Sequence, residues 1–180
     1  MEWFALTAKE NFERFLLPRA DEAWRCLQLG CFAGDASLWI MENLPYATLV
    51  DVDTFRGSDE HKDLDMETVK AIYADRTEPY RGRIAVKVGQ TVQYLTNPLT
   101  PPFDFIYVDA DHHAASVLID GLLSWPLLTR GGLMAFDDYT WGPNMDWMDR
   151  PVGGIEAFCE FYEREMEPVF VGSQVWLKKV

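Results

Sequence analysis

A pair of glycines directly after the first apolar run of the chain has the spacing of a ligand-binding turn. The run is Arg25–Leu29, and Gly30 and Gly34 follow it. Glycines between a buried strand and a helix let the backbone approach a ligand closely. A helix N-terminus there adds unpaired N–H groups and partial positive charge. The GxxxG spacing differs from the GxGxxG of dinucleotide folds, which argues against a pyrophosphate-bearing cofactor. A tight turn without a ligand is the alternative for this motif alone.

An aspartate, Asp53, ends the second apolar run. An acidic residue about twenty residues after such glycines can accept hydrogen bonds from both hydroxyls of a ribose. Asp51 is the rival, because strand alternation places both side chains on one face. Asp53 lies nearer the carboxyl edge, where open α/β sheets bind ligands, and is therefore our candidate. A solvated aspartate at a strand end is the alternative.

Three further carboxylates follow two apolar runs that read as buried strands. Asp109 follows Phe103–Val108, and Asp137 and Asp138 follow Gly132–Phe136. Parallel buried strands would bring them to one sheet edge, where they repel one another unless a cation or bound protons compensate. Hard oxygen ligands suit Mg²⁺, with Ca²⁺ or Mn²⁺ as alternatives. We therefore predict a metal site; in the competing interpretation one carboxylate caps a turn and another pairs with a basic residue.

A histidine stands beside the first of these carboxylates. His112 follows Asp109 by three residues, at the start of a predicted helix. Near neutral pH it could take a proton from a substrate hydroxyl. His113 is the competitor for this role, and a surface histidine at a helix start is the alternative for both.

The elements that must position these residues follow a repeating order. Short apolar runs alternate with amphipathic stretches, a pattern typical of a parallel sheet covered by helices. The order is a helix, five β–α units and a final hairpin-like pair, in a single domain spanning 1–180. The predicted strands are Arg25–Leu29, Ala47–Asp53, Arg83–Val88, Phe103–Val108, Gly132–Phe136, Pro168–Val171 and Gln174–Lys178. The predicted helices are Thr7–Leu17, Asp35–Asn43, Asp65–Asp75, Thr91–Leu95, Ala114–Leu128 and Gly154–Glu165.

Composition narrows the function classes. The formal net charge of −13 argues against nucleic acid and anionic membrane surfaces as partners, since both would repel the protein. The cysteines are odd in number and form no CxxC pair, so neither a disulfide framework nor a zinc site is indicated. The first residues lack a basic start followed by an apolar core, and no apolar run reaches the ~18 residues of a membrane span. A soluble protein in the reducing cytoplasm is expected.

Taken together, these residues resemble the class I S-adenosylmethionine-dependent methyltransferases, in particular methyltransferase family 24, which is akin to catechol and macrolide-sugar O-methyltransferases. The resemblance covers nearly the whole chain and is carried by Cys26–Ile40, Val52–His61, Phe103–His112, Leu127–Trp141 and Gly172–Lys179. The expected fold is α/β: a Rossmann-like three-layer sandwich around a mostly parallel seven-stranded sheet whose last strand is antiparallel.

The resemblance also implies a cofactor site. Gly30 and Gly34 would line the methionine end of S-adenosylmethionine, Asp53 would hold its ribose, and the residues after the third strand would contact its adenine. Gln28 stands where an acidic residue is usual, and Ser37 would substitute for a common serine one position earlier. The implied cofactor-binding residues are Gln28, Gly30, Gly34, Ser37, Asp53, Gly89, Gln90, Thr91 and Asp109.

The metal and the base are implied in the same way. Metal-dependent relatives carry an aspartate and an acidic pair 28 residues apart, which is the separation of Asp109 and Asp137. The resemblance thus implies a metal site of Asp109, Asp137 and Asp138. In the catechol enzymes a lysine base follows the first metal ligand by three residues, the place of His112, so the catalytic residues would be His112 and Asp109.

The expected activity is metal-assisted O-methylation of a hydroxyl on a small molecule or sugar. The loop Tyr139–Arg150 is aromatic and could be a wall for the acceptor, a brace, or a contact in a homo-oligomer. The polar segment Arg56–Met66 could close over the cofactor. Two rivals stay open: a nucleotide- or NAD-binding oxidoreductase of similar fold, and a non-catalytic accessory protein that binds S-adenosylmethionine.

Overall fold

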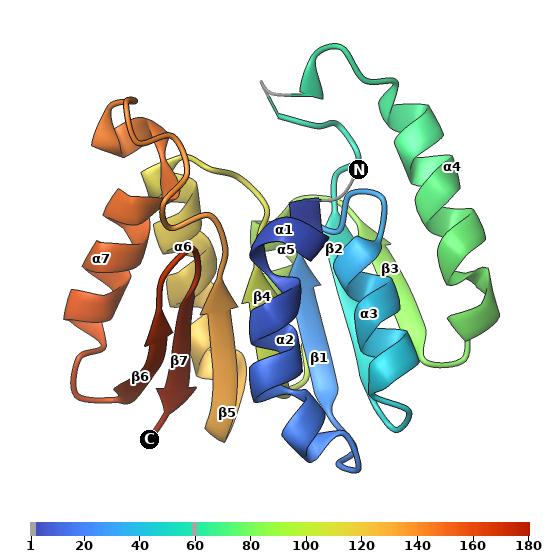
Figure 1. Ribbon diagram of the computed structural model, residues 1–180, viewed down its shortest axis with the longest axis horizontal. Coiled ribbons are helices and arrows are strands. Elements are labelled where there is room, and N and C mark those ends of the chain that lie inside the picture. The colour runs from blue at the N-terminus through green and yellow to red at the C-terminus, as the bar shows by residue number, and fades with distance from the viewer. Residues whose placement is uncertain (1–2, 59–60) are drawn as a thin grey trace.

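A seven-stranded sheet in the order β3-β2-β1-β4-β5-β7-β6 forms the centre of the computed structural model, which describes residues 3–58 and 61–180 (Figure 1). Neighbouring strands from β3 to β5 pair in parallel, whereas β7 is antiparallel to both β5 and β6. The strands are β1 Arg25–Leu29, β2 Thr48–Asp53, β3 Ile84–Val88, β4 Phe103–Val108, β5 Leu128–Phe136, β6 Met166–Val171 and β7 Val175–Lys179.

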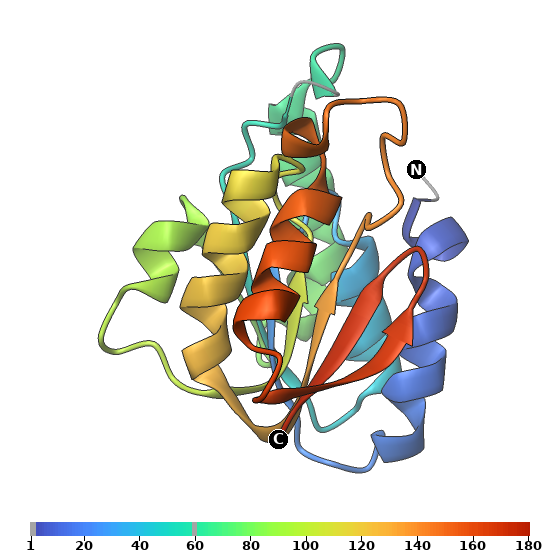
Figure 2. The ribbon, with the colours of Figure 1, turned by 90° about the vertical axis from the view of Figure 1, so that its left-hand side faces the viewer.

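Helices cover both faces of this sheet (Figure 2). One layer contains α1 Trp3–Thr7, α2 Lys9–Phe15 and α3 Asp35–Asn43, with α4 Met66–Thr77 beyond α3. The other layer contains α5 Thr91–Leu95, α6 Ala114–Ser124 and α7 Pro151–Phe161. The predicted Rossmann-like three-layer sandwich is therefore confirmed. Among the described residues, none of the helices has both the length and the apolar character to cross a membrane.

The central strand β4 carries buried apolar side chains on both of its faces, because helices cover both sides of the sheet. In β4, Phe105 and Tyr107 join the core beneath α2 and α3, where Phe12 contacts both rings edge-on. The alternate residues Ile106 and Val108 join the opposite core, beneath α6 and α7. This two-sided packing fixes the strand direction and register, so the carboxyl ends of β1 to β5 meet at one edge.

Some element boundaries differ from the sequence-based expectation. The single helix predicted over Thr7–Leu17 is divided into α1 and α2 and is followed by a 3₁₀ turn that contains Pro18. The helix predicted to reach Leu128 ends at Ser124, because Pro126 stands in the next 3₁₀ turn and lacks the N–H that a continuing helix needs.

Candidate active site

The carboxyl ends of the first five strands border a cavity of about 1130 Å³. Most of the residues singled out in the sequence meet on its wall. These are Gln28, Gly30, Asp53, Gly89, Gln90, Thr91, Asp109, His112, Asp137 and Asp138. Gly34 and Ser37 are not part of this wall.

Gly30 is required by the close approach of two strand ends. Its φ is +82°, and a Cβ at this position would overlap the backbone carbonyl of Asp109. Its N–H donates to the carbonyl of Val52 at 2.9 Å, so the turn is tied to β2 as well. Gly34, with the same φ, is the N-cap of α3, and its Cβ would lie 3.0 Å from the ring of Tyr73. The turn therefore holds the backbone of β1, β2 and β4 together at the cavity.

Asp53 holds this turn by its carboxylate. Oδ2 accepts hydrogen bonds from the backbone N–H groups of Cys31 at 2.8 Å and Phe32 at 2.9 Å, and Oδ1 accepts from that of Phe55 at 2.7 Å. Phe32 has a φ of +45°, rare for a residue with a side chain. A carboxylate offers about four acceptor sites, so Asp53 retains capacity toward the cavity. This support of the turn was not foreseen in the sequence.

Ser37 and Asp51 support the turn from behind. Ser37 is fully buried, and its hydroxyl lies 2.7 Å from Asp51 Oδ2 and 3.2 Å from Gln28 Oε1. Tyr73 also donates to Asp51 Oδ2 at 2.7 Å, and the amide of Gln28 donates to the carbonyl of Gly30 at 2.8 Å. The structure thus connects Ser37 to the glycine turn through Gln28 and does not bring it to the cavity.

The buried Asp51 predicts a pH-dependent stability. Burial raises the pKa of Asp51 to about 7, and its Oδ1 is buried without a hydrogen-bond partner. This pKa exceeds the value of 3.8 that serves for the unfolded chain. The contribution of Asp51 to the free energy of unfolding is therefore fully present below pH ~4 and is lost as the pH rises toward 7. Asp51→Asn should diminish that loss by at least about 1 kcal/mol between pH 5 and 8.

Urea unfolding of wild type and variant at the two pH values measures this difference. Asp75→Asn removes the same charge from an exposed position on α4 and should leave the wild-type pH dependence intact. An identical pH dependence in wild type and Asp51→Asn would show that Asp51 is not responsible.

Asp109, His112 and Asp138 converge at the ends of β4 and β5. One potential ligand atom from each lies within 4.8 Å of those of the others, an arrangement that could hold a metal ion. His112 Nε2 is 3.1 Å from Asp138 Oδ2, and the imidazole packs against Trp141 with 4.6 Å between ring centroids. The histidine is thereby fixed beside the carboxylates, with its side chain only 18% exposed.

Asp137 lies deeper than its neighbours. Its Oδ2 accepts a short hydrogen bond from the hydroxyl of Tyr107, and its Oδ1 accepts the backbone N–H of Asp138 at 2.8 Å. Burial, with repulsion from Asp138, raises the pKa of Asp137 to about 6. Burial and repulsion from Asp137 and Asp138 likewise raise the pKa of Asp109 well above its usual range. A bound cation would relieve this repulsion.

The two histidines have different surroundings. His113 is the N-cap residue of α6, its Nδ1 lies 2.7 Å from Asp111 Oδ1, and its side chain is 59% exposed. The structure therefore brings His112 to Asp109 and Asp138 and places His113 at the cavity mouth with Asp111.

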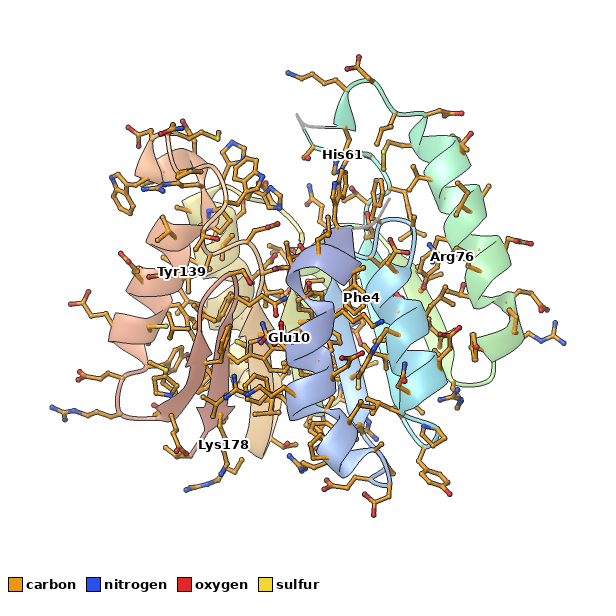
Figure 3. All side chains as sticks on the ribbon, viewed as in Figure 1. Phe4, Glu10, His61, Arg76, Tyr139 and Lys178 are labelled. Atoms are coloured by element: carbon orange, nitrogen blue, oxygen red, sulfur yellow. The ribbon has the colours of Figure 1, made fainter. Side chains whose placement is uncertain are left out.

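An aromatic cluster not foreseen in the sequence borders the same cavity. Phe32, in the glycine turn, stacks on His61 at 4.9 Å and contacts Trp3 of α1 at 5.6 Å between ring centroids. His61 lies beyond the strand ends, above α1 (Figure 3). It belongs to the polar segment expected to cover the cofactor, of which residues 59–60 lie outside the described residues.

The aromatic loop Tyr139–Arg150, expected as an acceptor wall, a brace or an oligomer contact, borders the cavity at one end. From Tyr139–Arg150 only Trp141 is part of the described wall, whereas Met145, Trp147 and Met148 are exposed outside it. Trp141 is therefore the loop's contact with the reaction site.

Comparisons with known proteins identify the family of this chain. Residues 27–139 match the methyltransferase domain model of methyltransferase family 24. A curated relative, the uncharacterized protein R132 of Acanthamoeba polyphaga mimivirus, is 24% identical over 136 residues, which are 73% of this chain and 60% of that protein. The chain thus spans less than two thirds of that relative's length.

Solved structures share the fold. The O-methyltransferase TomG from Streptomyces achromogenes, involved in tomaymycin synthesis and solved with S-adenosylmethionine, is 21% identical with a TM-score of 0.71, covering 96% of this chain and 80% of TomG. An O-methyltransferase from Bacillus cereus with S-adenosylhomocysteine is 20% identical with a TM-score of 0.69, over 94% and 80% of the two chains. MycE, from the mycinamycin biosynthetic pathway and solved with Mg, S-adenosylhomocysteine and mycinamycin VI, is 16% identical with a TM-score of 0.68, over 98% and 49%. The match over more than half of its residues shows that this chain belongs to methyltransferase family 24.

Proposed function

We propose that this protein transfers the methyl group of S-adenosylmethionine to a hydroxyl oxygen of a small molecule or sugar. A divalent metal ion, for which Mg²⁺ is our first choice, would assist the transfer. The observation that carries the proposal is the convergence of Asp109, His112 and Asp138 in the cavity that also contains the glycine turn. Such a transfer needs a turn that binds the cofactor, oxygen ligands for the metal and a base, all in one cavity.

The cofactor would lie across the ends of β1, β2 and β4. Gly30 lets the ligand approach the backbone, and Asp53 offers its remaining acceptor capacity to a ribose. Family membership supports this assignment, as do the cofactors in the structures of TomG and the Bacillus enzyme.

The residues present fit a divalent cation. Asp109 and Asp138 supply oxygen ligands, and Asp137 adds a third carboxylate next to them. The raised pKa values of Asp109 and Asp137 reflect burial and repulsion between neighbouring carboxylates, and a cation would offset that repulsion. A cation held by these residues would lower the pKa of an acceptor hydroxyl. The Mg in MycE supports this choice of ion.

His112 would act as the general base. Its Nε2 faces the carboxylates, and the contact with Asp138 at 3.1 Å orients the ring to receive the acceptor's proton. Trp141 packs on the same ring and keeps it from turning away.

Thermal unfolding with different ligands tests this proposal. S-adenosylhomocysteine at about 100 times its Kd should raise Tm by roughly 5–10 °C in a chain of this size. Mg²⁺ should add to the shift and a chelator should remove that addition. A shift with NAD but not with S-adenosylhomocysteine would favour the oxidoreductase. Binding without methyl transfer from labelled S-adenosylmethionine to any hydroxyl compound in a broad panel would favour the accessory protein.

A further inference from the structure

A buried carboxylate that the proposed reaction does not use borders the cavity and is not part of the cluster of candidate metal ligands. Asp120 of α6 is 3% exposed, and it is part of the cavity wall. Thr91 of α5 donates a hydrogen bond from its hydroxyl to Asp120 Oδ1 at 2.6 Å. No hydrogen bond reaches Oδ2 from the described residues. Asp120 therefore has an acceptor oxygen to offer.

The burial of this carboxylate is compensated only in part. Burial raises the pKa of Asp120 to about 6, while the bond from Thr91 acts in the opposite direction. A buried carboxylate normally gathers several donors, since each lost water must be replaced. A ligand with an N–H donor at this position would supply a second one.

The surface beside Asp120 is apolar. Val92 of α5 and Ile119 of α6 are 41% and 44% exposed, and both border the same cavity. Water-exposed aliphatic side chains next to a single acceptor suit a flat ring that buries its faces and presents an amino group at its edge. Adenine is such a ring.

The position of Asp120 relative to Asp53 and the Asp109 cluster is consistent with a site for adenine. The turn after β3 is hydrogen-bonded to β2 through Gly89 N–H and the carbonyl of Asp53 at 2.9 Å. In the strand order β3-β2-β1-β4-β5, Asp53 thus lies between the α5 side and the cluster around Asp109. A ligand whose ribose is at Asp53 and whose reactive end is at the cluster must direct its base toward α5.

We propose that Asp120 accepts a hydrogen bond from the exocyclic amino group of the cofactor's adenine and so selects adenine over a 6-oxo purine. Thr91 is the positioning residue, since it fixes the carboxylate through Oδ1. This inference rests on S-adenosylmethionine being the cofactor.

Calorimetric binding of two ligands, S-adenosylhomocysteine and S-inosylhomocysteine, tests the proposal. The inosyl compound carries a carbonyl oxygen where adenine carries its amino group. Wild type should prefer the adenosyl compound by at least about 10-fold, because a carboxylate facing a carbonyl leaves both acceptors unpaired. Asp120→Asn should lower that preference at least about 10-fold, because its amide N–H can donate to the carbonyl.

Three further substitutions, two at Thr91 and one at Asp111, separate recognition of the ligand from support of the fold. Thr91→Val should weaken the preference, and Thr91→Ser, which keeps the hydroxyl, should restore it. Asp111→Asn removes the same charge from the same cavity wall, but both Asp111 oxygens already accept hydrogen bonds, from His113 and Ser116, so the preference should not change.

The outcomes are distinct from those of the proposed function. If Asp120→Asn weakens both ligands by the same factor, Asp120 only ties α5 to α6 and the inference is wrong. If wild type binds neither ligand while circular dichroism shows it folded, the cofactor assignment itself fails.

Discussion

Gly30→Ala is expected to destabilise the protein by more than about 4 kcal/mol, which is at the extreme for a single substitution. Two costs combine at this position. The φ of +82° is unfavourable for any residue with a Cβ, and that Cβ would overlap the backbone carbonyl of Asp109. The overlapped atom is backbone in a central pair of strands, so no side-chain rotation can relieve the contact. Relief requires β1 and β4 to separate, and both helical layers pack on these strands.

Urea unfolding followed by circular dichroism measures this cost, and two other glycines provide matched controls. Gly131 has a φ of +79° with no atom within 4 Å of its Cβ position, so Gly131→Ala isolates the backbone cost, about 1–2 kcal/mol. Gly82 has neither the positive φ nor a neighbour, so Gly82→Ala should stay within about 0.5 kcal/mol of wild type. If Gly30→Ala costs no more than Gly131→Ala, the close approach of the two strand ends is not what selects glycine.

Several elements were predictable because local signals and burial agree. The predicted bounds of β1, α3, β4 and α5 match the structure, since glycine turns or prolines delimit each of them. The predicted start of β5 was wrong: the strand was expected to begin at Gly132, but it begins at Leu128. Its first residues, including Gly131 and Gly132, read as a turn in isolation, but pairing with β4 across a register shift draws them into the sheet.

The site was predictable to the extent that it depends on strand ends. Asp109 and Asp138 meet because consecutive buried parallel strands deliver their last residues to one edge, which the sequence pattern conveys. The support of Asp53 for the glycine turn, and of Asp51 and Ser37 behind it, depends on where side chains point, which the pattern does not convey. One feature of the sequence could have indicated Asp120: it is the only acidic residue in the otherwise largely apolar helix AASVLIDGLLS.

The cavity also combines segments whose proximity no local pattern encodes. Trp3 of α1 contacts Phe32 of the glycine turn. The strand order that brings the β3 turn beside Asp53 is a property of the whole sheet. Tertiary packing settles both, so they emerge only from the structure.

Asp109→Asn is expected to abolish turnover while making the metal-free protein more stable at pH 8. Activity should fall by more than about 100-fold, beyond the loss typical of a residue that only supports a metal ligand. The stability change has the opposite sign. Burial and repulsion from Asp137 and Asp138 raise the pKa of Asp109 in the folded protein. The contribution of Asp109 to the free energy of unfolding is therefore present at low pH, and it is lost as the pH rises above the pKa of this residue in the unfolded chain. Asparagine keeps the shape without the charge and avoids that loss.

Methyl-transfer rates with Mg²⁺ and urea unfolding in chelator at pH 5 and 8 measure the two effects. Binding of S-adenosylhomocysteine should survive the substitution within a few-fold, because asparagine keeps the backbone of residue 109, which lies against the glycine turn. A variant that is less stable at pH 8 and retains full activity in chelator would exclude a metal role for Asp109. Asp111→Asn is the matched control, and its activity and stability should change far less, because Asp111 bonds to His113 and Ser116 outside the cluster.

The companion variant His112→Gln separates a base from a ligand, since His112 shares the cluster with Asp109 and Asp138. If His112 is the general base, its substitution should lower kcat by about 10²–10⁴-fold and remove the histidine limb of the pH–rate profile. The increase in Tm on adding Mg²⁺ should then persist, because the carboxylates that hold the ion remain. If that increase disappears together with activity, His112 binds the metal and the proton must be taken by another group.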